Sequence, residues 1–222
     1  MTEHDATRGE TSHGATRREA LRRAAIGAGG LTAAGLLTPA LAAAQSSDDE
    51  DLRDFLAPAI ALEQITVLAY ATAADANGVE PFLRDRLETF RDQEQAHASA
   101  LRQALDSLGF DVPEEPSAVD DTGVFDIDGI DDAQMTEFTR LLGRIGEVKK
   151  RDDALDLLAQ LERRQLDYYL SEAPGLDSED LSTTGAEIAG CQAQHIVVLR
   201  EALGDAPADA VAEVGAAQPA SG

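Results

Sequence analysis

The sequence predicts an all-α protein, a four-helix bundle made of two repeated helical hairpins that a long crossover with an extra helix connects. Three observations carry this prediction. The chain of 222 residues is rich in alanine, leucine and charged residues, and only 4% of it is aromatic, which favours helices over a sheet. Apolar residues recur at helical spacing in four long segments, and the second pair of segments repeats the first. Residues that start or stop helices bound each segment.

The first predicted hairpin follows a run of acidic residues. Such a run favours the positive end of a helix dipole, so we expect the first helix over about residues 51–75. Asn77 and Gly78 are typical of a turn, and Pro81 suits the first turn of the next helix. The second helix is therefore predicted over about residues 81–108.

The crossover is predicted over about residues 109–152, with a helix of about 15 residues that starts at Asp132. Its first part is acidic and contains prolines. The glycine in this part comes too early for the loop of a calcium-binding EF-hand. A solvated linker, in which Asp131 or Asp132 caps the next helix, is the favoured interpretation.

The second predicted hairpin completes the bundle. Its helices are expected over about residues 153–172 and 182–203, and Pro174 and Gly175 separate them. The chain then divides into a signal peptide over residues 1–44, the bundle over residues 45–204, and a small, polar tail over residues 205–222 that we predict to be disordered.

The N-terminal segment resembles a twin-arginine export signal. Arg17 and Arg18 precede a mildly apolar stretch, and the alanines at 42–44 fit a cleavage site before Gln45. This signal implies export by the twin-arginine route to an extracellular or cell-envelope location, with no stable membrane insertion after cleavage. An uncleaved membrane anchor is the alternative, because the apolar stretch is near the minimum length for a span.

The charge of the chain excludes one class of partner. A net charge of −24 argues against nucleic acid, because phosphates would be repelled. Lys149 and Lys150 are the only lysines; an acidic, lysine-poor surface fits high external salt and equally fits a GC-rich genome. The single cysteine, Cys191, allows no internal disulfide.

The two hairpins repeat one pattern of polar residues. Each first helix carries a glutamate seven residues before a tyrosine: Glu63 and Tyr70, then Glu162 and Tyr169. Each second helix carries a similar motif, EQAH and then QAQH. At a rise of about 1.5 Å per residue, the glutamate and the motif of each hairpin reach nearly the same height.

Six polar residues interrupt the apolar stripes that a bundle buries. They are Glu63, Glu94, His97, Glu162, Gln192 and His195. A buried carboxylate is costly unless it is paired or bound to a metal. One such residue could be a satisfied polar group in a core, but six at matched heights on four helices indicate a shared polar centre.

A glutamate from each of two helices, with Glu-x-x-His from the other two, is the di-metal pattern of ferritin-like bundles. On Glu63, Glu94, His97, Glu162 and His195, the sequence resembles the exported ferritin-like domain family, which includes desiccation- and stress-related proteins. The resemblance covers most of the predicted bundle. It implies a ferritin-like fold and metal ions as partners, iron or manganese, at these residues and at the position of Gln192.

Gln192 departs from the family's pattern, in which a glutamate usually bridges both metals. Four carboxylates would neutralise two divalent ions, whereas three leave an excess positive charge. Gln192 offers only a neutral carbonyl oxygen, so two weakly held metals, one metal and no metal are all open. Cys191 is either a soft ligand that favours zinc or copper or, preferably, a small buried apolar residue. Tyr70 and Tyr169 are either donors to the ligands or ordinary core aromatics.

The resemblance leads to a hypothesis of function with alternatives. It implies an exported ferritin-like protein with a degenerate carboxylate and histidine site that binds iron or manganese in stress protection. The alternative is a non-enzymatic structural or stress-related envelope protein without metal. A third interpretation is an interaction module whose acidic crossover binds basic partners or cations. The bundle is expected as a monomer or a homodimer, and nothing in the sequence identifies an organic substrate.

Overall fold

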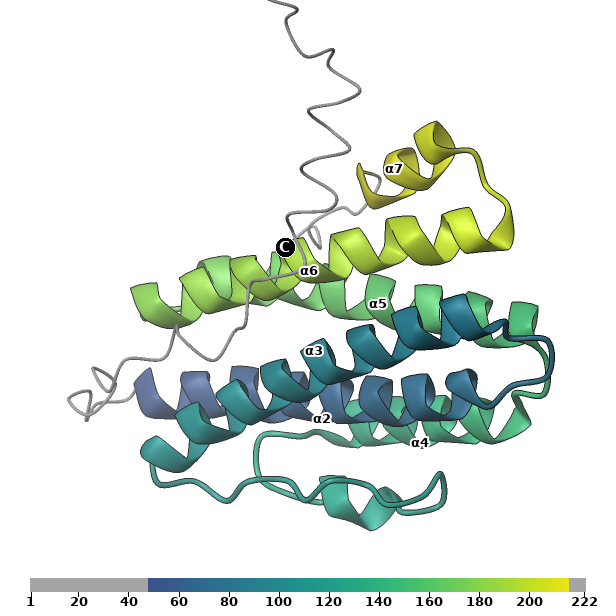
Figure 1. Cartoon of the computed structure of the whole chain (residues 1–222). Helices are drawn as coiled ribbons and strands as arrows, with labels where there is room; N and C mark the ends of the chain where they lie inside the picture. Colours follow the sequence, from purple (N-terminus) through teal and green to yellow (C-terminus); the bar gives the residue numbers. More distant parts are fainter. Residues whose placement is uncertain (1–47, 216–222) are drawn as a thin grey trace, which may run out of the picture. The chain divides into compact units, whose positions relative to one another are not determined.

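The computed structural model describes residues 48–215, and four long helices form the body of this part of the chain (Figure 1). They are α2 (Asp48–Ala74), α3 (Pro81–Ser107), α5 (Arg151–Glu172) and α6 (Glu179–Leu203). No strand occurs among the described residues. The predicted all-α, four-helix bundle is confirmed.

Two helical hairpins make up the bundle, because α2 packs along α3, α5 packs along α6, and α2 also packs against α5. Asn77, in the turn of the first hairpin, bridges to the start of α5. Its N–H donates to the carbonyl of Lys149 over 3.1 Å, and the N–H of Arg151 donates to its carbonyl over 2.9 Å. The bridge aligns the end of α2 with the beginning of α5. Glu63 and Glu162, each 11 residues from these aligned ends, therefore reach the same height.

The helix ends have local causes in the sequence. Asp131 caps α4 (Asp132–Glu147), as predicted: its carboxylate accepts from the N–H of Gln134 over 2.7 Å, and the Gln134 side chain accepts from the N–H of Asp131 over 2.8 Å. The hydroxyl of Ser178 accepts an N–H from the first turn of α6. Gly204, at φ 104°, ends α6 in the left-handed region. Helices α2, α5 and α6 begin within one turn before their predicted starts.

The crossover between the hairpins is packed onto the bundle. It contains the 3-10 helix η3 (Thr122–Phe125) and α4, which lies against α2. Phe125 is fully buried, and its ring meets that of Phe138 with centroids 5.6 Å apart. Gly129 has a φ of 91°, and a Cβ there would lie 3.1 Å from the Cβ of Ala57. The extra helix is as predicted, but a buried aromatic residue anchors the acidic part that we expect to be a solvated linker.

The C-terminal tail differs from the prediction of disorder. Helix α7 (Pro207–Gly215) packs against α6, and Ala210 is fully buried. Alanines and a proline in the first turn favour a helix, and contact with α6 supplies the burial that so short a helix lacks alone. The prediction of disorder is wrong for these residues. Residues 216–222 and the predicted signal peptide at 1–44 lie outside the described residues.

Helix α2 is the central helix, because it contacts α3, α4 and α5. Within residues 48–215, it is the one helix long and apolar enough to cross a membrane, over Asp49–Ala74. In the bundle, 78% of its most apolar stretch is buried. The apolar side chains of α2 therefore form part of the core of the bundle.

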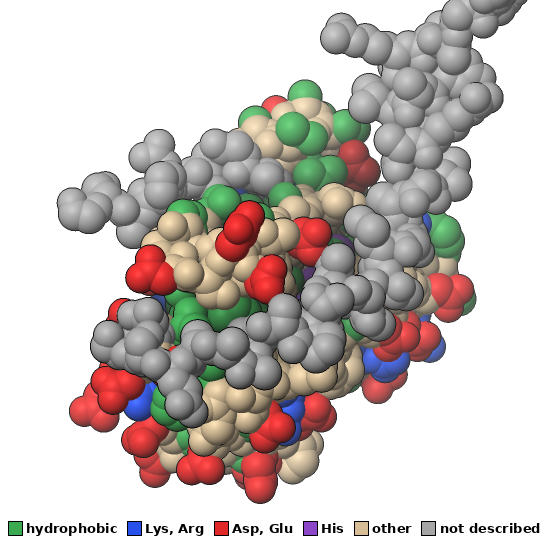
Figure 2. Space-filling model, turned by 90° about the vertical axis from the view of Figure 1, so that its left-hand side faces the viewer, with side chains coloured by type: hydrophobic (Ala, Val, Ile, Leu, Met, Phe, Trp, Pro, Cys, Tyr) green, Lys and Arg blue, Asp and Glu red, His purple; other side chains and the backbone are tan. Residues whose placement is uncertain are grey.

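Acidic side chains are spread over the face of the molecule that Figure 2 shows, with few basic ones among them. Some arginines pair with acids, as Arg53 does with Asp54 at 2.7 Å and Arg164 with Glu137 at 2.8 Å. Exposed ion pairs of this kind contribute little to stability. The acidic surface consequently bears on solubility and on the attraction of cations more than on the fold.

Gly185 of α6 lies too close to η4 (Ala173–Gly175) to carry a side chain. A Cβ there would be 2.7 Å from the Cβ of Ala173. We expect Gly185→Ala to lower the free energy of unfolding by about 1–3 kcal/mol through overpacking. Gly190→Ala is the control, because no atom lies within 4 Å of a Cβ at this exposed position and alanine favours a helix by roughly 1 kcal/mol. Denaturant unfolding followed by circular dichroism measures both, and equal effects would contradict the close contact.

Candidate metal centre

Six polar side chains meet in the middle of the bundle, and they are the six that the sequence predicts. In chain order they are Glu63 on α2, Glu94 and His97 on α3, Glu162 on α5, and Gln192 and His195 on α6. All six are buried, with relative exposures between 0% and 6%. The four helices therefore bring every predicted site residue into one buried centre.

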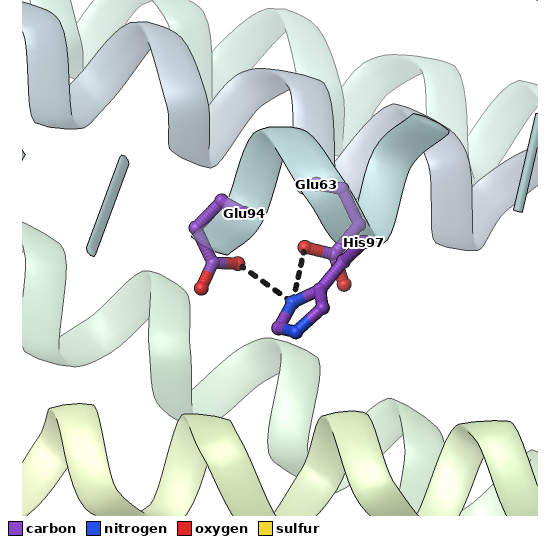
Figure 3. Close-up of side chains that lie close together, drawn as sticks. All are labelled: Glu63, Glu94 and His97. Carbon is purple, nitrogen blue, oxygen red and sulfur yellow. Dashed lines mark ion pairs between the residues drawn. The ribbon is translucent and has the colours of Figure 1, made fainter. Parts of the chain in front are cut away.

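The first group of candidate ligands consists of Glu63, Glu94 and His97, whose ligand atoms lie within 4.8 Å of one another. The Nδ1 of His97 is 3.7 Å from Oε2 of Glu63 and 3.8 Å from Oε2 of Glu94 (Figure 3). The Glu-x-x-His spacing places Glu94 and His97 one turn apart on one face of α3. Together with Glu63 of α2, the first hairpin thus supplies a complete group.

The second group consists of Glu94, Glu162 and His195. The Nδ1 of His195 is 3.0 Å from Oε1 of Glu162 and 3.1 Å from Oε1 of Glu94. Glu94 belongs to both groups and turns one oxygen toward each histidine. The second group therefore includes a carboxylate from the first hairpin.

Gln192 stands where the repeat would place a fourth carboxylate. Its Nε2 donates to Oε2 of Glu94 over 3.0 Å, and the Nε2 of Gln165 donates to the same oxygen over 3.3 Å. Gln165 is fully buried on α5, three residues after Glu162, and was not among the predicted site residues. A signal was present in the sequence, because a glutamine interrupts the apolar stripe of α5 at that position.

Two tyrosines donate hydrogen bonds to the centre from the opposite hairpin. The hydroxyl of Tyr70 on α2 donates to Oε1 of Glu162 on α5, and that of Tyr169 on α5 donates to Oε1 of Glu63 on α2, both over 2.5 Å. Burial, and then the charges of nearby glutamates, raise the pKa of both tyrosines well above the ordinary value. Both hydroxyls therefore keep their protons and orient candidate ligands, beyond any role as core aromatics.

The outer nitrogen of His195 is held at the edge of the centre. Its Nε2 lies 2.8 Å from Oε1 of Gln93 and 3.5 Å from Sγ of Cys191, and the ring of Phe90 stacks on the imidazole at 4.0 Å between centroids. The Gln93 oxygen only accepts, so Nε2 carries a hydrogen, and Nδ1 is directed at the carboxylates. Cys191 is half-buried and lies outside both groups. Gln93 was not predicted, although it occupies the repeat position of Cys191.

Burial sets the charge states of the carboxylates. It raises the pKa of Glu162 to about 7, an effect that the charge of Glu94 strengthens and that His195 opposes. Burial and Glu94 likewise raise the pKa of Glu63 well above its ordinary value. Burial acts on Glu94 too, but the nearby imidazoles of His195 and His97, whose Nδ1 atoms lie 3.1 Å and 3.8 Å from its oxygens, hold its pKa well below the usual range. Glu94 is therefore the carboxylate that stays ionised.

Several buried polar atoms of the centre have no hydrogen-bond partner. They are Oε2 of Glu63, Oε1 of Glu94, Nδ1 of His97, Oε2 of Glu162, Oε1 of Gln165 and Oε1 of Gln192. A buried acceptor without a donor costs about 1–3 kcal/mol, whereas carboxylate, carbonyl and imidazole atoms bind divalent cations. The residues present therefore fit a divalent metal ion.

Comparison with known proteins agrees with this arrangement. A family model described as a ferritin-like domain matches residues 50–205. Neither the curated proteins nor the solved structures give a match. The match runs from the first turn of α2 past the end of α6 and so includes both hairpins, the crossover and all six residues of the centre.

The raised pKa of Glu162 makes the stability of the metal-free protein depend on pH. A raised carboxyl pKa stabilises the native state fully below the unfolded value of 4.5, and this effect is lost as pH rises through about 7. In chelator, we expect Glu162 to lower the free energy of unfolding over this range by on the order of 3 kcal/mol, and Glu162→Gln to remove this contribution. Thermal unfolding across the range measures the effect, with exposed Glu187→Gln on α6 as control. The same pH slope in the wild type and in Glu162→Gln would contradict it.

Proposed function

Because the chain belongs to the ferritin-like domain family, we propose that it binds iron or manganese at the buried centre and serves as an exported stress-protection protein. The observation that carries metal binding is the set of buried polar atoms that have no hydrogen-bond partner. They belong to the two groups of candidate ligands and to the two glutamines beside them. A divalent cation would satisfy such oxygens and ring nitrogens.

The carboxylates of the centre share a feature that suits metal ligands. One oxygen of each accepts a hydrogen bond: from Tyr169 in Glu63, from two amides in Glu94, and from Tyr70 in Glu162. The other oxygen of each has no partner. Hydrogen bonds that orient ligating carboxylates in this way are usual around metal sites, and they leave the second oxygen for the ion.

The ligand types favour iron or manganese among the transition metals. Each group offers two carboxylates and one imidazole, and no thiolate belongs to either group. Oxygen-rich sets of this kind suit manganese and ferrous iron better than copper. When bound, such an ion would supply one-electron redox chemistry. The chain's own residues would bind the ion, fix the orientation of its ligands and keep bulk water away from it.

A metal-free structural role is the second candidate, as a stress-related envelope protein that is not an enzyme. One observation favours it. The amides of Gln192 and Gln165 both donate to Glu94. Neutral groups therefore already stabilise part of the negative charge that a metal ion would otherwise balance. The centre would then be a hydrogen-bonded polar core, and its stability would not respond to metal ions.

Metal binding should raise the melting temperature of the full-length protein. Elemental analysis of protein purified without chelator comes first, and metal-free protein is then heated with and without Mn²⁺ or, anaerobically, Fe²⁺. An ion at 100 times its Kd stabilises the native state by about 2.7 kcal/mol. Glu94→Gln should abolish the response, because both groups use Glu94, and surface Glu187→Gln should keep it. A wild type that ignores both ions would favour the metal-free role.

Export is supported by the sequence alone, because the segment concerned lies outside the described residues. The pair Arg17 and Arg18 precedes a weakly apolar stretch, as in twin-arginine signals. We expect Arg17→Lys with Arg18→Lys to leave folded protein in the cytoplasm. The control exchanges Arg22 and Arg23 for lysine, which keeps the same charge a few residues later. Cell fractionation measures both, and normal export of the first variant would show that another route is used.

A further inference from the structure

The two ligand groups are equivalent in the repeat except at one position. Glu94 of α3 has Gln192 of α6 as its counterpart. A symmetric centre would treat two ions alike, one in each group. Here an amide replaces a carboxylate at Gln192, the counterpart of the one residue, Glu94, that both groups share, so the two groups are expected to differ.

The two oxygens of Glu94 have different surroundings. Oε1 lies 3.1 Å from Nδ1 of His195, in the second group, and has no hydrogen-bond partner. Oε2 faces His97, in the first group, and accepts from the amides of Gln192 at 3.0 Å and Gln165 at 3.3 Å. Two amide hydrogens on Oε2 occupy its lone pairs and place positive partial charge where a cation would sit. Oε1 of Glu94 is therefore free to bind an ion in the second group, whereas Oε2 is not free to bind one in the first.

The distances between the ligand atoms also favour an ion in the second group over one in the first. In the second group, Nδ1 of His195 lies 3.1 Å from Oε1 of Glu94 and 3.0 Å from Oε1 of Glu162, the oxygen that also accepts from Tyr70. Ligand atoms bound at about 2.1 Å to an octahedral ion lie about 3 Å apart, so His195 and the free oxygen of Glu94 already have the separation that an ion needs. In the first group, the corresponding distances from His97 are 3.7 Å and 3.8 Å.

The charge of the centre is a third reason to expect a single ion. The centre has three buried carboxylates, one fewer than two divalent cations require, but more than enough for one. An uncompensated charge in a buried site is strongly unfavourable. A glutamate in place of Gln192 would remove the deficit, and the amide does not.

We propose that the centre binds a single divalent cation in the second group, at Glu94, Glu162 and His195. Gln192 and Gln165 close the position in the first group. This inference rests on the proposed function, because it specifies how many ions the centre takes and where. Glu63 and His97 then contact Glu94 and hold it in place without binding an ion.

Titration of the metal-free, full-length protein tests the assignment. Free Mn²⁺ is counted by electron paramagnetic resonance, and Co²⁺ binding is followed by visible absorption. We expect one ion per chain. Glu162→Gln and His195→Ala should weaken binding about 100-fold or more, because loss of a ligand exceeds the effect of losing its supporting groups. The repeat-equivalent variants, Glu63→Gln and His97→Ala, remove only groups that hold Glu94 in place, so they should weaken binding less, by about 10-fold.

Gln192→Glu should open the first group, so that the variant takes two ions per chain. In chelator it should melt below the wild type, because four buried carboxylates repel one another more than three. Gln194→Glu is the matched control, since Gln194 is exposed on the same helix and the exchange adds the same charge at the surface. That control should still take one ion.

The outcomes distinguish this inference from the proposed function. Two ions per wild-type chain, equal weakening by Glu63→Gln and Glu162→Gln, or one ion in Gln192→Glu would each overturn the single-ion assignment and leave metal binding intact. No ion bound by the wild type or by any variant would overturn the proposed function itself. Far-ultraviolet circular dichroism shows whether each variant is folded. If a ligand variant does not fold, the number of ions bound by Gln192→Glu tests the single-ion assignment.

Discussion

The charge on Glu94 is the constraint around which the middle of the bundle is arranged. Its carboxylate is fully buried, and an unpaired charge in such a place would cost much of the about 5–15 kcal/mol by which native proteins are stable. Both histidines of the centre and the amides of Gln165 and Gln192 are directed at it. These partners come from α3, α5 and α6, so the need to balance one side chain fixes the relative positions of three helices.

The hydrogen bonds of the centre cross from one hairpin to the other. Tyr70 of the first hairpin donates a hydrogen bond to Glu162 of the second, and Tyr169 of the second donates one to Glu63 of the first. Each of these glutamates takes its tyrosine hydrogen bond from the other hairpin, so both bonds form only when the halves dock in one register. The backbone bridge at Asn77 sets the same register from the end of the bundle. Two independent contacts therefore specify one alignment, which is the role that buried polar networks fill in some proteins.

The repeat explains why so much of the centre could be predicted. Six polar residues stand at apolar positions and at matched heights, so counting along the helices was enough to bring them together. Gln165 escaped prediction because its repeat position in the first half holds Thr66, and spacing does not show which oxygen of Glu94 an amide will bond, since that depends on rotamers. The helix in the tail depends on the contact of Ala210 with α6, a tertiary effect that local composition lacks.

The burial of α2 bears on how a chain of this kind could leave the cell. Taken alone, the helix Asp49–Ala74 has the length and apolar character of a membrane span. A translocase that threads unfolded polypeptide would meet it soon after the proposed signal peptide, as a stop-transfer sequence. In the folded bundle, 78% of that stretch is hidden. For the export proposed above, folding before passage would keep the segment out of the lipid and would let the centre bind the proposed ion before the protein leaves the cell.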